Sequence, residues 1–119
     1  MRTHKDLEVW KRSVNFVTKI YEVTQTYPKQ EKYGIVSQIR RAAVSIPSNI
    51  SEGAARKHKR EFIQFLYIAL SSLAELETQI IISMNLDFIR KTKFNKLRSE
   101  LIEIKNMLVG LIRYCKNKM

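Results

Sequence analysis

The chain has 119 residues, and its 22 Lys and Arg against 11 Asp and Glu give a formal net charge of +11. This length predicts one domain with a real core and is too short for two. Three Gly and two Pro in a chain that is 45% hydrophobic exclude an architecture of many short strands and favour a few long helices. Cys115 is the single cysteine and the N-terminus lacks the apolar run of a secretory signal, so we expect a cytoplasmic protein.

Apolar residues recur at three- and four-residue steps over the first half of the chain, which is typical of one helical face. The first such pattern predicts a helix over residues 6–26, which ends before Pro28. The second predicts a helix over residues 33–55 and contains Pro47, which removes a backbone donor and crowds the carbonyl of Ala43. We therefore expect a kink or a local break at Pro47.

The segment from Glu61 to Ile89 contains no Lys or Arg and predicts a third helix, over residues 59–86, that is apolar around most of its circumference. Its length would cross a bilayer, but polar residues such as Gln64 and Glu75 are scattered through it, and each is costly in hydrocarbon. We therefore expect a core helix and no membrane partner. One small bundle cannot cover so much apolar surface, so part of this helix is expected to contact another subunit.

A regular alternation of apolar residues predicts the fourth helix, over residues 92–117, with Thr92 as its N-cap. The connections between the four helices are short, and short connections force neighbouring helices to run antiparallel. The sequence thus predicts an all-α protein, in which residues 1–119 form one antiparallel, up-down-up-down four-helix bundle domain.

Residues 38–56, QIRRAAVSIPSNISEGAAR, are the most distinctive segment of the chain. If the second and third helices fold back on each other near residue 58, then Arg40 and Arg41 come level with Glu75 and Glu77. We interpret these four residues as structural ion pairs that set the register of the two helices. A site for phosphate or another small anion is the alternative interpretation.

Lys and Arg gather in clusters that the predicted topology places at the two ends of the bundle. A net charge of +11 exceeds the range of about 2 to 8 that solubility requires of a small domain, which favours a polyanionic partner. We expect a nucleic acid, most readily a structured RNA bound by its shape or backbone, because no base-reading motif is present. The residues that we expect to contact it are Arg56, Lys57, Lys59, Arg60, Arg90, Lys91, Lys93 and Lys96.

Catalytic motifs are missing from the sequence. It contains no glycine-rich phosphate loop, no nucleophile elbow and no HExxH motif, and His4 and His58 lack metal-ligand spacing. Cys115 lies on an apolar stripe, so we expect a packed core thiol and not a nucleophile. We expect no enzymatic activity, no cofactor and no metal.

Four segments carry a resemblance to a known family, and together they cover about half of the chain. The segments are DLEVWKRSV (residues 6–14), YPKQEKYG (27–34), SQIRRAAVSIPSNISEGAAR (37–56) and EFIQFLYIALSSLAELETQI (61–80). They resemble the four-helix bundle proteins encoded within 23S rRNA intervening sequences of bacteria, although Ser51 stands where the motif commonly has Ala. The resemblance implies a ring-shaped homo-oligomer, a homopentamer, and an association with RNA or ribosomal material.

A related bundle gives a hypothesis of a different class. The chain is also similar to the accessory protein of diversity-generating retroelements, a basic pentamer that binds a reverse transcriptase and its nucleic acid. This resemblance implies an adaptor whose main partner is a protein. A reverse transcriptase gene beside this one would favour the adaptor, whereas an enclosing rRNA insertion would favour the RNA-binding bundle.

Overall fold

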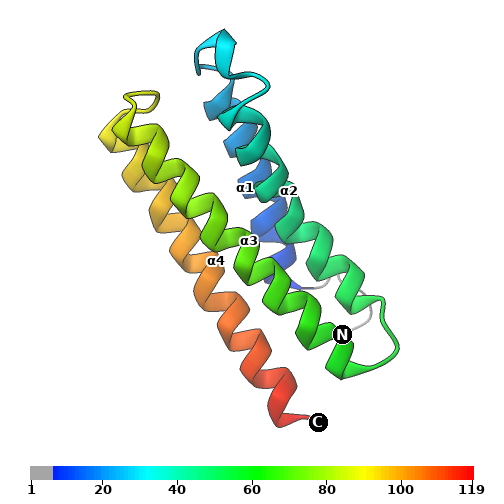
Figure 1. Ribbon diagram of the computed structural model, residues 1–119. Helices are drawn as coiled ribbons and strands as arrows, with labels where there is room; N and C mark the ends of the chain where they lie inside the picture. Colours follow the sequence, from blue (N-terminus) through cyan, green and yellow to red (C-terminus); the bar gives the residue numbers. More distant parts are fainter. Residues whose placement is uncertain (1–6) are drawn as a thin grey trace.

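The computed structural model describes residues 7–119 and contains four long helices and one short 3₁₀ helix, with no strand among those residues. The helices are α1 (Glu8–Thr24), α2 (Ile35–Ala54), α3 (Lys59–Asn85) and α4 (Lys91–Asn117), and the 3₁₀ helix η2 (Lys29–Glu31) lies between α1 and α2. They form an elongated body of 46 × 24 × 19 Å (Figure 1). The prediction of an all-α, four-helix fold is confirmed.

Each helix packs along its sequence neighbours, and α1 touches α4 more sparingly than the other neighbouring pairs touch each other. The α1–α2 and α3–α4 connections lie at one end of the body, whereas the α2–α3 connection and the C-terminus lie at the other (Figure 1). The core is formed by the inner stripes of all four helices, because burying these side chains removes apolar surface from water. Its most deeply buried large side chains include Phe16, Ile20, Ile39, Ile46, Ile50, Leu66, Leu76, Leu101, Ile104 and Leu108.

Pro47 is buried inside α2, and the helix runs without interruption from Ile35 to Ala54. The expected local break therefore does not occur. The backbone donor that proline lacks would have bonded the Ala43 carbonyl, but apolar side chains on both sides of Pro47 keep α2 packed on the core. The hydroxyls of Ser45 and Ser72 also meet at 2.8 Å, which ties α2 to α3 just before the proline.

α2 and α3 pack tightly against each other at Gly53. A Cβ atom at this position would lie 2.6 Å from Phe65 Cβ and 2.9 Å from Phe62 Cδ1, closer than real side chains approach. Only glycine lets the two helices come this near, and the chain turns from α2 into α3 a few residues later. Gly53 therefore fixes the position of the basic turn that follows.

The end of α3 is closed by backbone hydrogen bonds around Asp87, whose φ of 61° lies in the left-handed region. The Phe88 amide donates to the Ser83 carbonyl at 2.9 Å, and the Asp87 amide donates to the Met84 carbonyl at 3.0 Å. This pair of bonds is a Schellman motif. It points the Phe88 ring toward Tyr27, at 5.4 Å between ring centroids, so the connection after α3 packs on the connection after α1.

The start of α4 differs from the prediction. The helix begins at Lys91 and its N-cap residue is Arg90, with no capping hydrogen bond from a side chain. Thr92 is exposed within the first turn, so the prediction that Thr92 caps the helix is wrong. The sequence here offers several polar residues in a row, from Arg90 to Lys93, so the sequence pattern does not single out the first residue of the helix.

Among the described residues, α3 is the one helix that is long and apolar enough to span a membrane by length and composition, with a mean hydropathy of 1.4. In the structure its inner stripe is core, packed against α2 and α4. Its outer surface nevertheless leaves large apolar side chains exposed: Tyr67, Ile68, Ile81, Ile82 and Leu86.

Candidate nucleic-acid interface

The turn between α2 and α3 carries the first group of predicted contact residues, Arg56, Lys57, Lys59 and Arg60, which we call the turn cluster. All four side chains are exposed. Arg56 has a carboxylate partner, Glu61, with 3.9 Å between Nη1 and Oε2, and its guanidinium lies 4.9 Å from the centre of the Phe65 ring. The other three cations have no carboxylate within ion-pair distance among residues 7–119, so their charge is available to an external anion.

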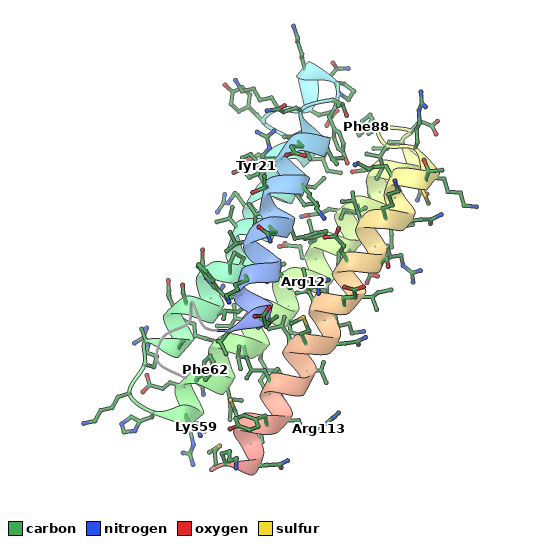
Figure 2. All side chains as sticks on the ribbon, turned by 180° about the vertical axis from the view of Figure 1, so that it is seen from behind. Arg12, Tyr21, Lys59, Phe62, Phe88 and Arg113 are labelled. Atoms are coloured by element: carbon green, nitrogen blue, oxygen red, sulfur yellow. The ribbon has the colours of Figure 1, made fainter. Side chains whose placement is uncertain are left out.

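The C-terminal end of α4 adds further positive charge beside the turn cluster. Lys59 and Arg113 lie at the same end of the molecule in Figure 2. Cys115 is buried next to this end, and burial raises the pKa of its thiol although the charge of Lys59 acts in the opposite direction. The predicted topology also brings Arg2 and Lys5 to this end, but both residues lie outside the described part of the chain.

Arg90, Lys91, Lys93 and Lys96, the other predicted contact residues, form the helix-start cluster at the opposite end. All four are exposed, and none forms an ion pair with a described residue. They surround the N-terminus of α4, whose free backbone amides and dipole also attract negative charge. Two acids lie nearby: Glu22 lines a hollow of about 440 Å³ together with Arg90 and Lys93, and the exposed Asp87 precedes Arg90 in the same connection.

Arg40 does not form the predicted ion pair with the third helix. Its guanidinium instead contacts α1, donating from Nε to Thr24 Oγ1 at 2.9 Å and from Nη2 to the Tyr21 carbonyl at 3.3 Å. It also lies 4.3 Å from the centre of the Tyr21 ring. The predicted register places Arg40 level with Glu75, but the rotation of α2 about its axis turns the side chain toward α1.

The other members of the predicted ion-pair layer also have different surroundings. Glu77 pairs with Arg98 of α4, with 3.6 Å from Oε2 to Nε. Arg41 and Glu75 line the same hollow, of about 350 Å³, but form no ion pair among the described residues. Gln79 lines this hollow as well, and its Oε1 is buried without a hydrogen-bond partner in residues 7–119.

The remaining cross-helix ion pairs lie along the α1–α4 edge and join residues far apart in sequence. Arg12 pairs with Glu103, and Lys19 pairs with Glu100. Neither pair could be predicted from the sequence, because the residue pattern within each helix does not show which residues of α1 and α4 face one another. Their consequence is a segregation of charge: carboxylates pair with cations along the α1–α4 edge, whereas seven of the eight cations in the two clusters have no such partner among residues 7–119.

Burial shifts the pKa of two side chains in the described part of the chain, those of Cys115 and Tyr27. No group of three or more His, Cys, Asp or Glu within residues 7–119 could hold a metal ion. The buried Cys115 has its pKa raised, which is the opposite of an activated nucleophile. Burial also raises the pKa of the Tyr27 phenol, against a smaller opposite effect of its hydrogen bond with Ser83.

These features define a class of protein: a basic, all-α bundle of four helices whose unneutralised charge is concentrated at its ends. The family model of the 23S rRNA-intervening sequence protein matches residues 5–110, and the chain belongs to this family. The resemblance stated from the sequence is thereby confirmed.

A solved structure shares the fold. It is a protein of unknown function from the S23 ribosomal protein family of Bacteroides thetaiotaomicron, known from a crystal structure. It is 24% identical to this chain and superposes with a TM-score of 0.81, covering 88% of this chain and 95% of its own. No curated protein matches the chain.

Proposed function

We propose that this protein is a non-enzymatic, cytoplasmic RNA-binding bundle that holds structured RNA through the turn cluster and the helix-start cluster. The observation that carries the proposal is the segregation of charge described above. Cations that served only folding or solubility would be expected to spread over the surface or to pair with carboxylates, as they do along the α1–α4 edge. Exposed cations concentrated at two ends favour contact with phosphates.

We further propose that the bundle is antiparallel, up-down-up-down, and that it assembles into a ring-shaped homo-oligomer, a homopentamer. The positions of the helix connections support the first part (Figure 1). The outer surface of α3 supports the second, because Ile68, Ile82 and Leu86 are 47%, 42% and 54% exposed in the single chain. Ile82 and Leu86 lie one turn apart at the end of α3, and exposed apolar side chains this close favour contact with another protein surface. In a ring, several copies of each cluster would face one RNA, and their combined affinity would exceed that of a single copy.

The test is RNA binding across a salt series, with a matched control for the loss of charge. In the first variant, Lys57→Gln, Lys59→Gln and Arg60→Gln remove three unpaired charges of the turn cluster. In the control, Lys11→Gln, Arg12→Gln and Lys19→Gln remove three charges that have carboxylate partners on or beside the α1–α4 edge.

For an RNA hairpin, we expect the first variant to bind more weakly and to lower the salt slope by about one for each cation that contacted a phosphate. The control is expected to bind nearly as the wild type does. Equal affinities and slopes for the two variants would remove the turn cluster from the interface.

The exposed surface of α3 also favours a second candidate, an adaptor that binds a reverse transcriptase. Both resemblances imply an oligomer, so the mass in solution does not separate the two candidates. Capture of a reverse transcriptase by the purified protein, weakened by Ile68→Lys on this surface, would favour the adaptor, whereas a lack of capture would favour the RNA-binding bundle.

A further inference from the structure

A hollow of about 560 Å³ lies between α1, α2 and their connection, and none of the eight cations of the two clusters lines it. Two tyrosines line it, Tyr21 from α1 and Tyr33 from the connection before α2. Three cations line it as well, namely Lys32, Arg40 and Arg41, and no Asp or Glu belongs to its wall. A neighbouring hollow shares Lys32 and Arg40 with this one and also has no acid in its wall, whereas Glu22 and Glu75 each line one of two other hollows.

The rings of both tyrosines are exposed to solvent, unlike those of core residues. Tyr33 is 88% exposed and Tyr21 is 38% exposed, and neither contributes to the buried core. In Figure 2, Tyr21 lies on the side of α1 that is turned away from α4. A tyrosine this exposed at the mouth of a hollow has an open ring face that a planar ligand can cover.

The cations are held beside these rings. Arg40 is fixed by its bonds to Thr24 and to the Tyr21 carbonyl and lies over the Tyr21 ring, so its position costs little ordering when a ligand binds. Its Nη1 makes no hydrogen bond with the described residues and can donate to an external acceptor. Lys32 Nζ lies 5.4 Å from the centre of the Tyr33 ring, so each tyrosine has a cation next to it.

Aromatic rings interleaved with cations are the combination that binds single-stranded nucleic acid, because bases stack on the rings while phosphates meet the positive charges. Paired helical RNA keeps its bases stacked inside and offers no such face to Tyr33. We propose that this hollow binds one or two unpaired nucleotides of a bound RNA, for example in a loop or at an end. This inference rests on the proposed RNA-binding function and adds a stacking site to its charged contacts.

The test compares an unstructured oligoadenylate with a fully paired RNA hairpin closed by a short stable loop. Tyr33→Ala removes the ring, and Tyr33→Phe keeps it. Because Tyr33 is largely exposed, neither change is expected to affect folding. We expect Tyr33→Ala to weaken oligoadenylate binding by about tenfold with an unchanged salt slope, while Tyr33→Phe binds as the wild type does. Photocrosslinking of the oligoadenylate, followed by peptide mapping, is expected to label the peptide that contains Tyr33.

The other outcomes overturn the proposal in distinguishable ways. If Tyr33→Ala binds oligoadenylate as the wild type does, while the triple variant of the turn cluster binds the hairpin weakly, the stacking site fails and the RNA-binding function stands. If Tyr33→Ala changes the mass of the protein in solution, another copy of the chain covers the hollow and no nucleotide does. If the wild type binds neither RNA, the stacking site and the proposed function fail together.

Discussion

The close approach of α2 and α3 at Gly53 can be tested with a single methyl group. In Gly53→Ala the new Cβ would lie 2.6 Å from Phe65 Cβ and 3.3 Å from the Phe62 carbonyl oxygen. Both of these atoms belong to the backbone or are attached to it, so no side-chain rotation relieves the clash and α3 has to move away. Overpacking of this kind costs roughly 1–3 kcal/mol, and the rigid surroundings place Gly53→Ala at the upper end of that range. The higher helix propensity of alanine returns about 1 kcal/mol, which leaves a net loss of about 2 kcal/mol.

Gly110→Ala is the matched control, because it makes the same chemical change in the middle of α4 where a Cβ meets nothing within 4 Å. There only the propensity term acts, and the variant is expected to be about 1 kcal/mol more stable than the wild type. Urea unfolding followed by circular dichroism measures both values, at one protein concentration because the stability of an oligomer depends on concentration. A Gly53→Ala protein as stable as Gly110→Ala would refute the close packing of α2 on α3.

Three further predictions follow from the ends of the bundle. Asp87→Gly is expected to raise the unfolding free energy by roughly 0.5–1 kcal/mol, because glycine adopts the left-handed backbone of this position without strain. A loss of stability in the same urea assay would contradict the Schellman motif at the end of α3. Lys91→Glu is expected to stabilise the protein by about 0.5 kcal/mol, because a negative charge complements the dipole at the N-terminus of α4, and yet to weaken RNA binding. If stability and RNA affinity fall together, this charge has no separate role in binding. Burial raises the pKa of Cys115, so the folded state favours the neutral thiol. The stability that the neutral thiol contributes is present below about pH 8.5 and is lost as the pH rises through the raised pKa of the folded state. Disulfide-exchange labelling of Cys115 is expected to be slow in the native protein and fast in denaturant.

Helical periodicity accounts for the parts of the fold that could be predicted from the sequence. Each of the four helices has its own apolar stripe, and this information is local, so the number of helices and the all-α class follow from it. The family resemblance rests on equally local information, such as the segment around Pro47. The break expected at Pro47 did not follow, because contacts with the core outweigh one lost backbone bond.

Contacts between helices depend on how each helix is rotated about its axis, and the sequence does not state that rotation. Arg40 illustrates the limit: the rotation of α2 decides whether the side chain meets Glu75 of α3 or Tyr21 of α1, and the structure shows the second. The pair Arg12–Glu103 could not be predicted for the same reason, since its members lie on the first and last helices. The hollow beside Tyr33 likewise appears only when α1, α2 and their connection are placed together.

Titration of the wild-type protein against an RNA hairpin at several salt concentrations tests the central claim most directly. If unneutralised cations at the ends of the bundle hold the RNA, the logarithm of the binding constant falls linearly with the logarithm of salt concentration, with a slope that reflects several phosphate contacts. Binding that is absent at low salt, or that is equally strong at low and high salt, would contradict the account.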